Sequence, residues 1–295
     1  MSILNIRDLS KHYKKITALN ELSLQVQPGM IFGILGPNGS GKTTTLGIVL
    51  GITQASGGHF EWFDGKYGNN PRRHIGALLE TPNFYPNLNA GDNLKIVAHI
   101  KKVEAPRIDE LLTLVNLLER KHSSFRTYSL GMKQRLAIAA ALIGDPDVMV
   151  LDEPTNGLDP QGIAEVRQII QKIGQTGKTI IMASHILDEV EKICTHVAII
   201  KQGKLLAAGT VGSLLTDDRI IEAAGPDLKA LMQALDGHPA VKKVQEENGL
   251  LLLYVEESLT TGKINELAFQ SGITLSHLRQ RVKSLEAEFL EITAN

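Results

Sequence analysis

Near its N-terminus the chain reads Gly36-Pro37-Asn38-Gly39-Ser40-Gly41-Lys42-Thr43-Thr44. The apolar run Ile31 to Leu35 before it has the length of a buried strand, and the residues after it have helical spacing. Glycines in such a turn let successive backbone N–H groups point into one concavity, and the helix N-terminus adds positive potential there. A chance glycine-rich turn is the alternative, but the flanking strand and helix favour a phosphate-binding loop.

The residue types at the end of this loop predict its ligands. Lys42 is expected to reach the β and γ phosphates, the Thr43 hydroxyl is suited to bind magnesium, and Thr44 offers a further phosphate donor. We therefore expect ATP and Mg²⁺ to bind here.

A second informative segment runs from Ser129 to Asp159 and sets four pieces in one order. They are a glycine turn, an apolar helical run, an acid-tipped strand and an Asp-Pro loop: Ser129 to Arg135, Leu136 to Gly144, Val148 to Pro154, and Gly157 to Pro160. Asp152 ends the strand, where a carboxylate can serve magnesium, and Glu153 is placed to polarise an attacking water as a general base. An ordinary polar turn is the alternative, but the strand, the phosphate loop and the order all agree.

Length and composition limit the class of protein. At 295 residues the chain has room for two cores, on a prior of roughly 150 residues per domain. Its 43% hydrophobic and 21% charged residues are those of an ordinary globular protein. The net charge of -1, without a basic cluster, makes nucleic acid a poor candidate partner.

Targeting signals and cysteine usage point to a cytoplasmic protein. The N-terminus lacks the apolar stretch of a signal peptide, so export is not expected. The longest apolar run, Leu136 to Gly144, is far below the roughly 20 residues that cross a bilayer, so a membrane role needs another chain. Cys194 is expected to be a small buried hydrophobe.

Strand-length apolar runs alternate with helical stretches up to about residue 215, which predicts an α/β domain with a mostly parallel sheet. The expected strands are Ile31 to Leu35, Ile75 to Leu79, Val148 to Leu151 and Thr179 to Ala183. Between residues 89 and 144 only helices are expected, which makes this span a helical insert: Leu94 to Ile100, Ile108 to Leu118 and Leu130 to Gly144. The amphipathic run Ile163 to Ile173 should form a helix that packs on the sheet.

The pattern changes around Thr210 to Asp218, so we expect one domain over residues 1–215 and another over 219–295. The second part can be parsed as strand, helix, strand, strand, helix, strand and a last helix from about Lys283. Its middle strands flank Asn248-Gly249, a strong hairpin signal. A ferredoxin-like α+β module with a packing or docking role is therefore expected.

The motifs together resemble the ATP-binding subunits of ATP-binding cassette (ABC) transporters, over roughly residues 3 to 215. The resemblance implies the ABC-type nucleotide-binding fold of the P-loop NTPases and a role for each motif. These are a Walker A loop (Gly36 to Thr44), a Walker B strand (Val148 to Glu153), a signature (Ser129 to Lys133), a D-loop (Gly157 to Asp159), a switch histidine (His185) and an adenine-stacking aromatic (Tyr13). A lone tyrosine or histidine is more often core or surface, so Tyr13 and His185 rest on the family.

The resemblance also implies partners. In this family the signature of one cassette closes over ATP held by another, so Ser129 and Gly131 would contact the ATP of a second subunit. Asp159 of the D-loop is a further expected nucleotide-binding residue. A homodimer is preferred to a heterodimer. A separate integral-membrane permease would hold the pair at the cytoplasmic face of the cell membrane.

Two departures narrow the group within the family. The signature reads Ser-Leu-Gly-Met-Lys-Gln, a form that resembles exporters whose membrane part is a separate six-helix chain. Glu80 stands where most cassettes carry a metal-binding glutamine, and this resembles self-protection exporters of bacitracin, lantibiotics and bacteriocins. Neutral drift at position 80 is an equal alternative. Phe84 and Tyr85 could dock a membrane subunit or could equally cover the insert.

The sequence therefore predicts the ATP-hydrolysing subunit of an ABC exporter, with antibiotic peptides, drugs or lipids as candidate cargo. A soluble ABC ATPase that acts on ribosomes or DNA is the alternative. It would be expected to carry a second cassette or a long coiled coil, and neither is present. A third alternative is a scaffold with incidental hydrolysis, and both Glu153 and His185 argue against it.

Overall fold

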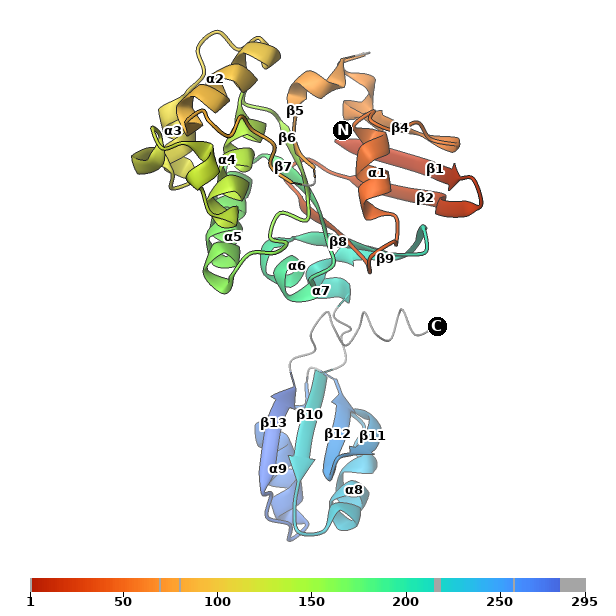
Figure 1. The fold of residues 1–295 in the computed structure, drawn as a ribbon. Helices are drawn as coiled ribbons and strands as arrows, with labels where there is room; N and C mark the ends of the chain where they lie inside the picture. The colour runs from red at the N-terminus through yellow and green to blue at the C-terminus, as the bar shows by residue number, and fades with distance from the viewer. Residues whose placement is uncertain (1, 69, 80, 215–218, 257, 282–295) are drawn as a thin grey trace. The chain divides into compact units, whose positions relative to one another are not determined.

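The computed structural model describes residues 2–68, 70–79, 81–214, 219–256 and 258–281. The chain forms two compact units, Met1–Val211 and Gly212–Asn295, which are described separately below (Figure 1). No helix among the described residues is long and apolar enough to span a membrane.

The first unit is built on a six-stranded sheet in the order β5-β6-β7-β3-β8-β9. Neighbouring strands are parallel except β8 and β9. The strands are β3 (Ile31–Leu35), β5 (Ile75–Leu78), β6 (Val148–Asp152), β7 (Thr179–Ser184), β8 (His196–Lys201) and β9 (Lys204–Thr210). The four expected strands are present with ends within one residue, and β3, β6 and β7 are buried along their whole length, as central parallel strands are.

A second, antiparallel sheet of this unit was not expected from the sequence. It has the order β2-β1-β4, with β1 (Leu4–Tyr13), β2 (Ile16–Val26) and β4 (Gly57–Trp62). Helix α1 (Lys42–Val49) shares one hydrophobic core with both sheets, because Leu46, Ile48 and Val49 cluster with residues of β1 and β3. This core fixes the start of α1, and with it the glycine-rich loop.

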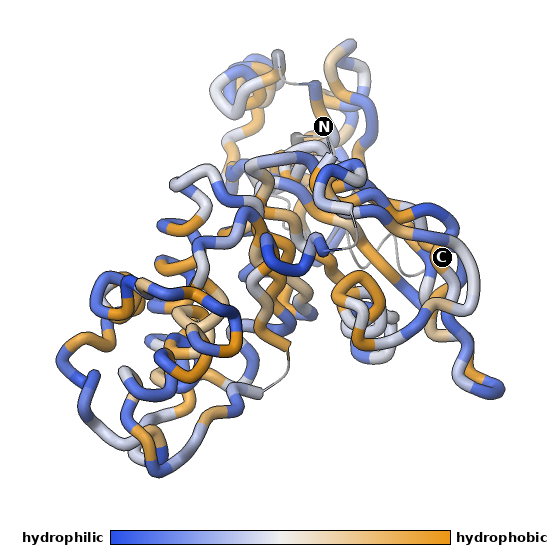
Figure 2. The backbone as a smooth tube through the Cα atoms, turned by 90° about the horizontal axis from the view of Figure 1, so that it is seen from above, coloured by the Kyte–Doolittle hydropathy of each residue, from blue (hydrophilic) through white to orange (hydrophobic). Residues whose placement is uncertain are grey.

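The span from residue 89 to 144 is helical, as expected. It holds α2 (Ala90–Lys101), α3 (Ile108–Leu114) and α4 (Leu130–Leu142), which gather on one side of the unit (Figure 1). Apolar and polar residues alternate along these helices, visible as orange and blue bands in Figure 2. The helix expected to reach Leu118 ends at Leu114, where the chain turns with a positive φ of 54° at Asn116.

Two further helices follow strands of the main sheet. Helix α5 (Pro160–Gln175) extends the predicted run Ile163 to Ile173 at both ends. Its apolar residues are buried from Val166 to Ile173, and Ile163 is half-buried. Helix α6 (Leu187–Ile193) ends just before the buried Cys194.

The second unit has the element order strand, helix, strand, strand, helix, strand. Its sheet is antiparallel throughout, in the order β11-β12-β10-β13, and its core contains residues of both helices. The elements are β10 (Arg219–Ala224), α8 (Leu228–Asp236), β11 (Val241–Glu247), β12 (Leu250–Val255), α9 (Thr261–Gln270) and β13 (His277–Arg281). The hairpin predicted at Asn248-Gly249 is present, with φ of 51° and 78°. The helix expected from Lys283 lies outside the described residues.

Candidate functional site

The carboxyl ends of β6, β7 and β3 lie side by side and bring three predicted segments together (Figure 1). Leu35 pairs with Ser184, and Asp152 pairs with Ala183. The glycine-rich loop follows β3, Glu153 follows β6, and His185 follows β7. Ligand sites of open parallel sheets form at this edge.

The phosphate loop needs glycine where the backbone is most crowded. A Cβ atom on Gly36 would lie 2.2 Å from the carbonyl oxygen of Ile200. Gly41 has a φ of +108°, which only glycine adopts freely, and a Cβ there would lie 2.6 Å from the Ala18 oxygen. Gly41 caps α1 without a side-chain hydrogen bond, so the first N–H groups of the helix are available to an anion.

The side chains of the loop suit a phosphate ligand. Lys42 is buried, and its Nζ donates to the carbonyl oxygens of Gly36 (2.7 Å) and Pro37 (3.2 Å). The buried Ser40 Oγ has no hydrogen-bond partner among the described residues. Thr43 at the start of α1 is exposed. A buried ammonium, an unpartnered hydroxyl and free N–H groups are what phosphate oxygens need, so these residues fit ATP with Mg²⁺.

Glu153 lies at the centre of this edge. Its Oε2 is 2.8 Å from Nδ1 of His185, and its Oε1 is 3.5 Å from Nζ of Lys42. Its backbone has a φ of +47°, rare for a residue with a side chain, and its N–H donates to the Ala183 oxygen at 3.0 Å. The neighbouring Asp152 is buried at the end of β6. A carboxylate held between a cation and an imidazole is suited to orient and deprotonate water.

Ser129, Gly131 and Asp159 lie together in a different place, around a hollow of about 450 Å³. Ser129 Oγ accepts a hydrogen bond from Met132 N (3.3 Å) at the start of α4, and Asp159 Oδ1 accepts one from Gly162 N (2.9 Å) at the start of α5. Within the described ranges, the residues that line this hollow include none of the phosphate loop. The N-termini of α4 and α5 therefore both border this hollow.

The remaining predicted residues have separate surroundings. Tyr13 is 44% exposed at the end of β1, with Nζ of Lys11 4.8 Å from its ring centroid. Phe84 contacts Phe125 of the insert at 5.1 Å between ring centroids, whereas Tyr85 is 61% exposed. One residue of the pair thus covers the insert and the other faces solvent. Glu80 lies outside the described residues.

One support of the phosphate loop was missed by the sequence reasoning. Gly203, in the turn between β8 and β9, donates its N–H to the carbonyl oxygen of Ser40 at 2.9 Å. Its own carbonyl accepts from Asn20 of β2 at 3.0 Å, which ties the loop to the antiparallel sheet. The signal was Gln202-Gly203 between two apolar runs, a hairpin turn with φ of 50° and 77°.

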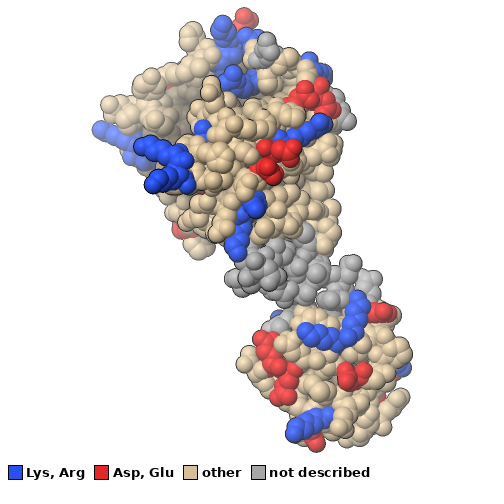
Figure 3. Space-filling view, turned by 90° about the vertical axis from the view of Figure 1, so that its right-hand side faces the viewer, with Lys and Arg blue, Asp and Glu red and all other residues tan. Residues whose placement is uncertain are grey.

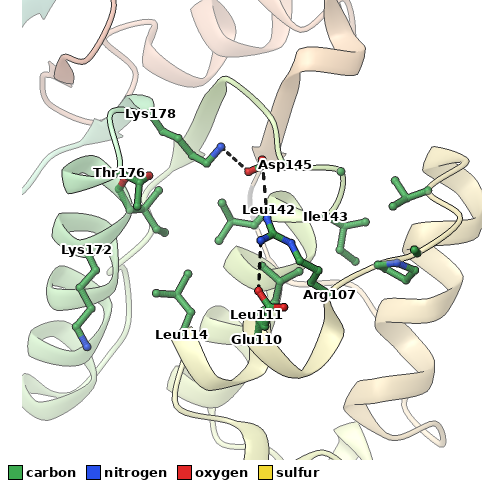
Figure 4. Close-up of a pocket in the computed structure, with 15 residues that line it drawn as sticks. Arg107, Glu110, Leu111, Leu114, Leu142, Ile143, Asp145, Lys172, Thr176 and Lys178 are labelled. Atoms are coloured by element: carbon green, nitrogen blue, oxygen red, sulfur yellow. Dashed lines mark hydrogen bonds and ion pairs between the residues drawn. The ribbon is translucent and has the colours of Figure 1, made fainter.

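A cavity of about 680 Å³ lies away from this edge, between the helical insert and α5 (Figure 4). Asp145 precedes β6 and forms two ion pairs. Its Oδ1 is 2.7 Å from Nζ of Lys178, and its Oδ2 is 3.8 Å from Nη2 of Arg107. Asp145 and Lys178 precede β6 and β7, at the amino ends of these parallel strands. None of the predicted nucleotide ligands lines this cavity.

Comparisons with known proteins agree with the geometry. The family model described as ABC transporter matches residues 19–156. The bacitracin transport ATP-binding protein BcrA of Bacillus licheniformis is 36% identical over 298 residues, covering 99% of this chain and 97% of BcrA. The lantibiotic transport ATP-binding protein SrtF of Streptococcus pyogenes is 40% identical over 204 residues, covering 69% of this chain and 89% of SrtF.

Among solved structures, the dimeric ATP-binding cassette MJ0796 bound to ADP and Pi has a TM-score of 0.63 and 25% identity. The match covers 70% of this chain and 98% of that one. The similarity to BcrA extends over almost the full length of both chains. The chain belongs to the ABC transporter family, as one of its ATP-binding subunits.

Proposed function

We propose that Glu153 and His185 are the catalytic pair with which this ABC subunit hydrolyses ATP. ABC cassettes bind ATP with Mg²⁺ and hydrolyse it to power transport, and this chain is one of them. The observation that carries the assignment is the 2.8 Å contact of Glu153 Oε2 with His185 Nδ1, beside the buried Lys42. The carboxylate would orient water and accept its proton, while His185 would keep the carboxylate in place.

The phosphate-binding role goes to residues 36–44. Lys42 would leave the carbonyl oxygens of Gly36 and Pro37 to bind the β and γ phosphates, and Ser40 and Thr44 would add donors. Bound Mg²⁺ would neutralise the charge that develops on the phosphates. Thr43, Asp152 and Glu80 are the proposed residues for the metal. Tyr13 is the proposed stacking partner of adenine.

A second subunit would complete each site. Ser129, Gly131 and Asp159 lie at outward helix N-termini, where fixed dipoles stabilise phosphate charge. We propose that they contact ATP held by a second copy of this chain. The MJ0796 cassette is dimeric, which supports the pairing.

The cargo we propose is an antibiotic peptide, exported through a separate membrane permease. The supporting observation is the similarity to proteins named for bacitracin and lantibiotic transport. The subunit would then sit at the cytoplasmic face of the cell membrane, with the exposed Tyr85 toward the permease. A soluble ABC ATPase acting on DNA or ribosomes is not favoured by these relatives.

We also propose that residues 1–215 form the ATPase domain and 219–295 a ferredoxin-like accessory domain. The strand order β11-β12-β10-β13 supports that assignment, as do the helices that follow β10 and β12 along the chain. The Asn248-Gly249 hairpin belongs to it.

The test is to identify a multi-span membrane protein that copurifies with the chain, co-express the two, purify the complex and measure ATP hydrolysis. Bacitracin or a lantibiotic should stimulate hydrolysis, and Glu153→Gln should lower it by about a hundred-fold or more while ATP still binds. Hydrolysis at the wild-type rate in the Glu153→Gln variant would contradict the catalytic role. A complex whose rate of ATP hydrolysis is not raised by any of these peptides would contradict the proposed cargo.

A further inference from the structure

Two charged side chains join the helix that follows Asp159 to the helix that follows His185. Arg167 lies on α5, which Asp159 caps, and Glu189 lies on α6, which begins at Leu187. Nη2 of Arg167 is 3.5 Å from Oε1 of Glu189, and the Glu189 side chain is only 5% exposed. The ion pair therefore connects α5, which begins at the Asp159 turn, with α6, which begins shortly after His185.

This ion pair is incomplete. Glu189 Oε2 and Arg167 Nε are both buried, and neither has a hydrogen-bond partner in the part of the chain that the structure describes. Burial raises the pKa of Glu189, and the charge of Arg167 opposes that shift. Buried charges with unpartnered atoms are poor stabilisers, because desolvation offsets much of their attraction. The pair is better explained by a role that depends on how the two helices sit.

Helix α6 is also fixed against the strand that leads into the phosphate loop. A Cβ atom on Gly33 of β3 would lie 2.9 Å from Val190 Cγ1 and 3.0 Å from Cys194 Sγ. A second link to α5 is the 3.0 Å hydrogen bond from Gln171 Nε2 to the carbonyl oxygen of Lys192. A small shift of α5 would thus be passed to α6, which begins two residues after His185.

We propose that Arg167 and Glu189 are positioning residues that couple the Asp159 turn to His185. This rests on the proposed function, in which Asp159 faces the second cassette and His185 holds Glu153. When the cassettes close, contact at Asp159 would hold α5 in place, and the Arg167–Glu189 pair would hold α6 with it. The His185 imidazole would then keep its 2.8 Å contact with the Glu153 carboxylate. Neither Arg167 nor Glu189 is among the groups proposed to touch ATP.

The first test measures kcat and KM for ATP with the purified full chain. Glu189→Gln should lower kcat roughly 10- to 100-fold, because a catalytic group out of place by about 1 Å can cost that much. KM should change by less than about two-fold, since the phosphate loop is untouched. Asp188→Asn is the matched control, because it removes an exposed carboxylate, paired with Lys192, from the same helix, and it should keep the wild-type kcat.

A second variant separates coupling from stability. Arg167→Met combined with Glu189→Leu removes both charges and should restore the melting temperature of the wild-type chain. Its kcat should remain low if the pair couples the two helices. Recovery of kcat together with the melting temperature, or a wild-type kcat in Glu189→Gln, would overturn the inference. Failure of the proposed function would look different, because the Glu153→Gln variant would then hydrolyse ATP at the wild-type rate.

Discussion

At the scale of single residues, Glu153 shows how the site is held. Its left-handed φ of 47° is costly for a residue with a side chain, and the backbone bond to Ala183 and the contacts with His185 and Lys42 maintain it. The sequence could place Glu153 at the end of a strand, since the apolar run before it is plain. Its φ and the contact with Lys42 depend on neighbouring strands and could not be read from the pattern.

The contact between Glu153 and His185 gives a residue-scale prediction. His185→Ala should lower kcat for ATP hydrolysis by about a hundred-fold, because the carboxylate loses the group that orients it. ATP binding, measured by calorimetry, should persist. His59→Ala changes an exposed histidine of β4 and should have no effect. Equal rates in both variants would remove His185 from the mechanism.

At the scale of elements, burial on both faces made central strands of the main sheet predictable from the sequence. Strands β3, β6 and β7 are buried on both faces, so they appear as continuous apolar runs. Strands β1 and β2 escaped prediction because they mix buried and exposed residues, and register shifts after Ile6, Leu9 and Lys11 interrupt their alternation.

The hairpin between β11 and β12 yields an element-scale prediction. Gly249 has a φ of 78°, so Gly249→Ala should destabilise the second unit by roughly 1 kcal/mol, seen as a lower melting temperature. Gly237→Ala is the control, because φ there is -87° and a Cβ would meet nothing within 4 Å. That change should be neutral or slightly stabilising. ATP hydrolysis should be unaffected by either. A Gly249→Ala protein as stable as the wild type would contradict the strain assigned to the turn.

Asp145 beside the insert gives a prediction about pH. The hydrogen bond from Lys178 lowers the pKa of Asp145 below its ordinary 3.8. Its stabilisation is therefore complete above that pH and is lost as the pH falls through the lower pKa of the folded protein. Asp145→Asn should cost roughly 0.5 kcal/mol at pH 7, because the side chain is 67% exposed, and nothing in strong acid.

Urea unfolding at pH 7 and in acid would measure the difference. Glu104→Gln is the control, because it changes an exposed carboxylate between α2 and α3. It should leave the free energy of unfolding unchanged at either pH. A cost for Asp145→Asn that does not change with pH would show that the ion pair with Lys178 is not its source.

At the scale of the whole molecule, the two sets of residues proposed to act on nucleotide lie apart in one chain. The phosphate loop, Glu153 and His185 share the carboxyl edge of the sheet, while Ser129, Gly131 and Asp159 surround a separate hollow. The sequence supplied both sets of residues through their motifs. Their separation required coordinates, because it depends on where the insert packs.

Acidic and basic residues are nearly balanced in this chain, with 31 lysines and arginines against 32 aspartates and glutamates. On the face shown in Figure 3, acidic and basic side chains are scattered among neutral ones over both units.

A site shared by two chains makes the mass of the Glu153→Gln chain in solution depend on ATP. Light scattering with ATP and Mg²⁺ should give twice the 32.1 kDa of one chain, and without ATP it should give the mass of one chain. Adding Ser129→Arg should abolish the ATP-dependent doubling, because the bulky side chain would block the second cassette from the γ-phosphate. A Glu153→Gln chain that binds ATP yet keeps the mass of one chain would contradict the account.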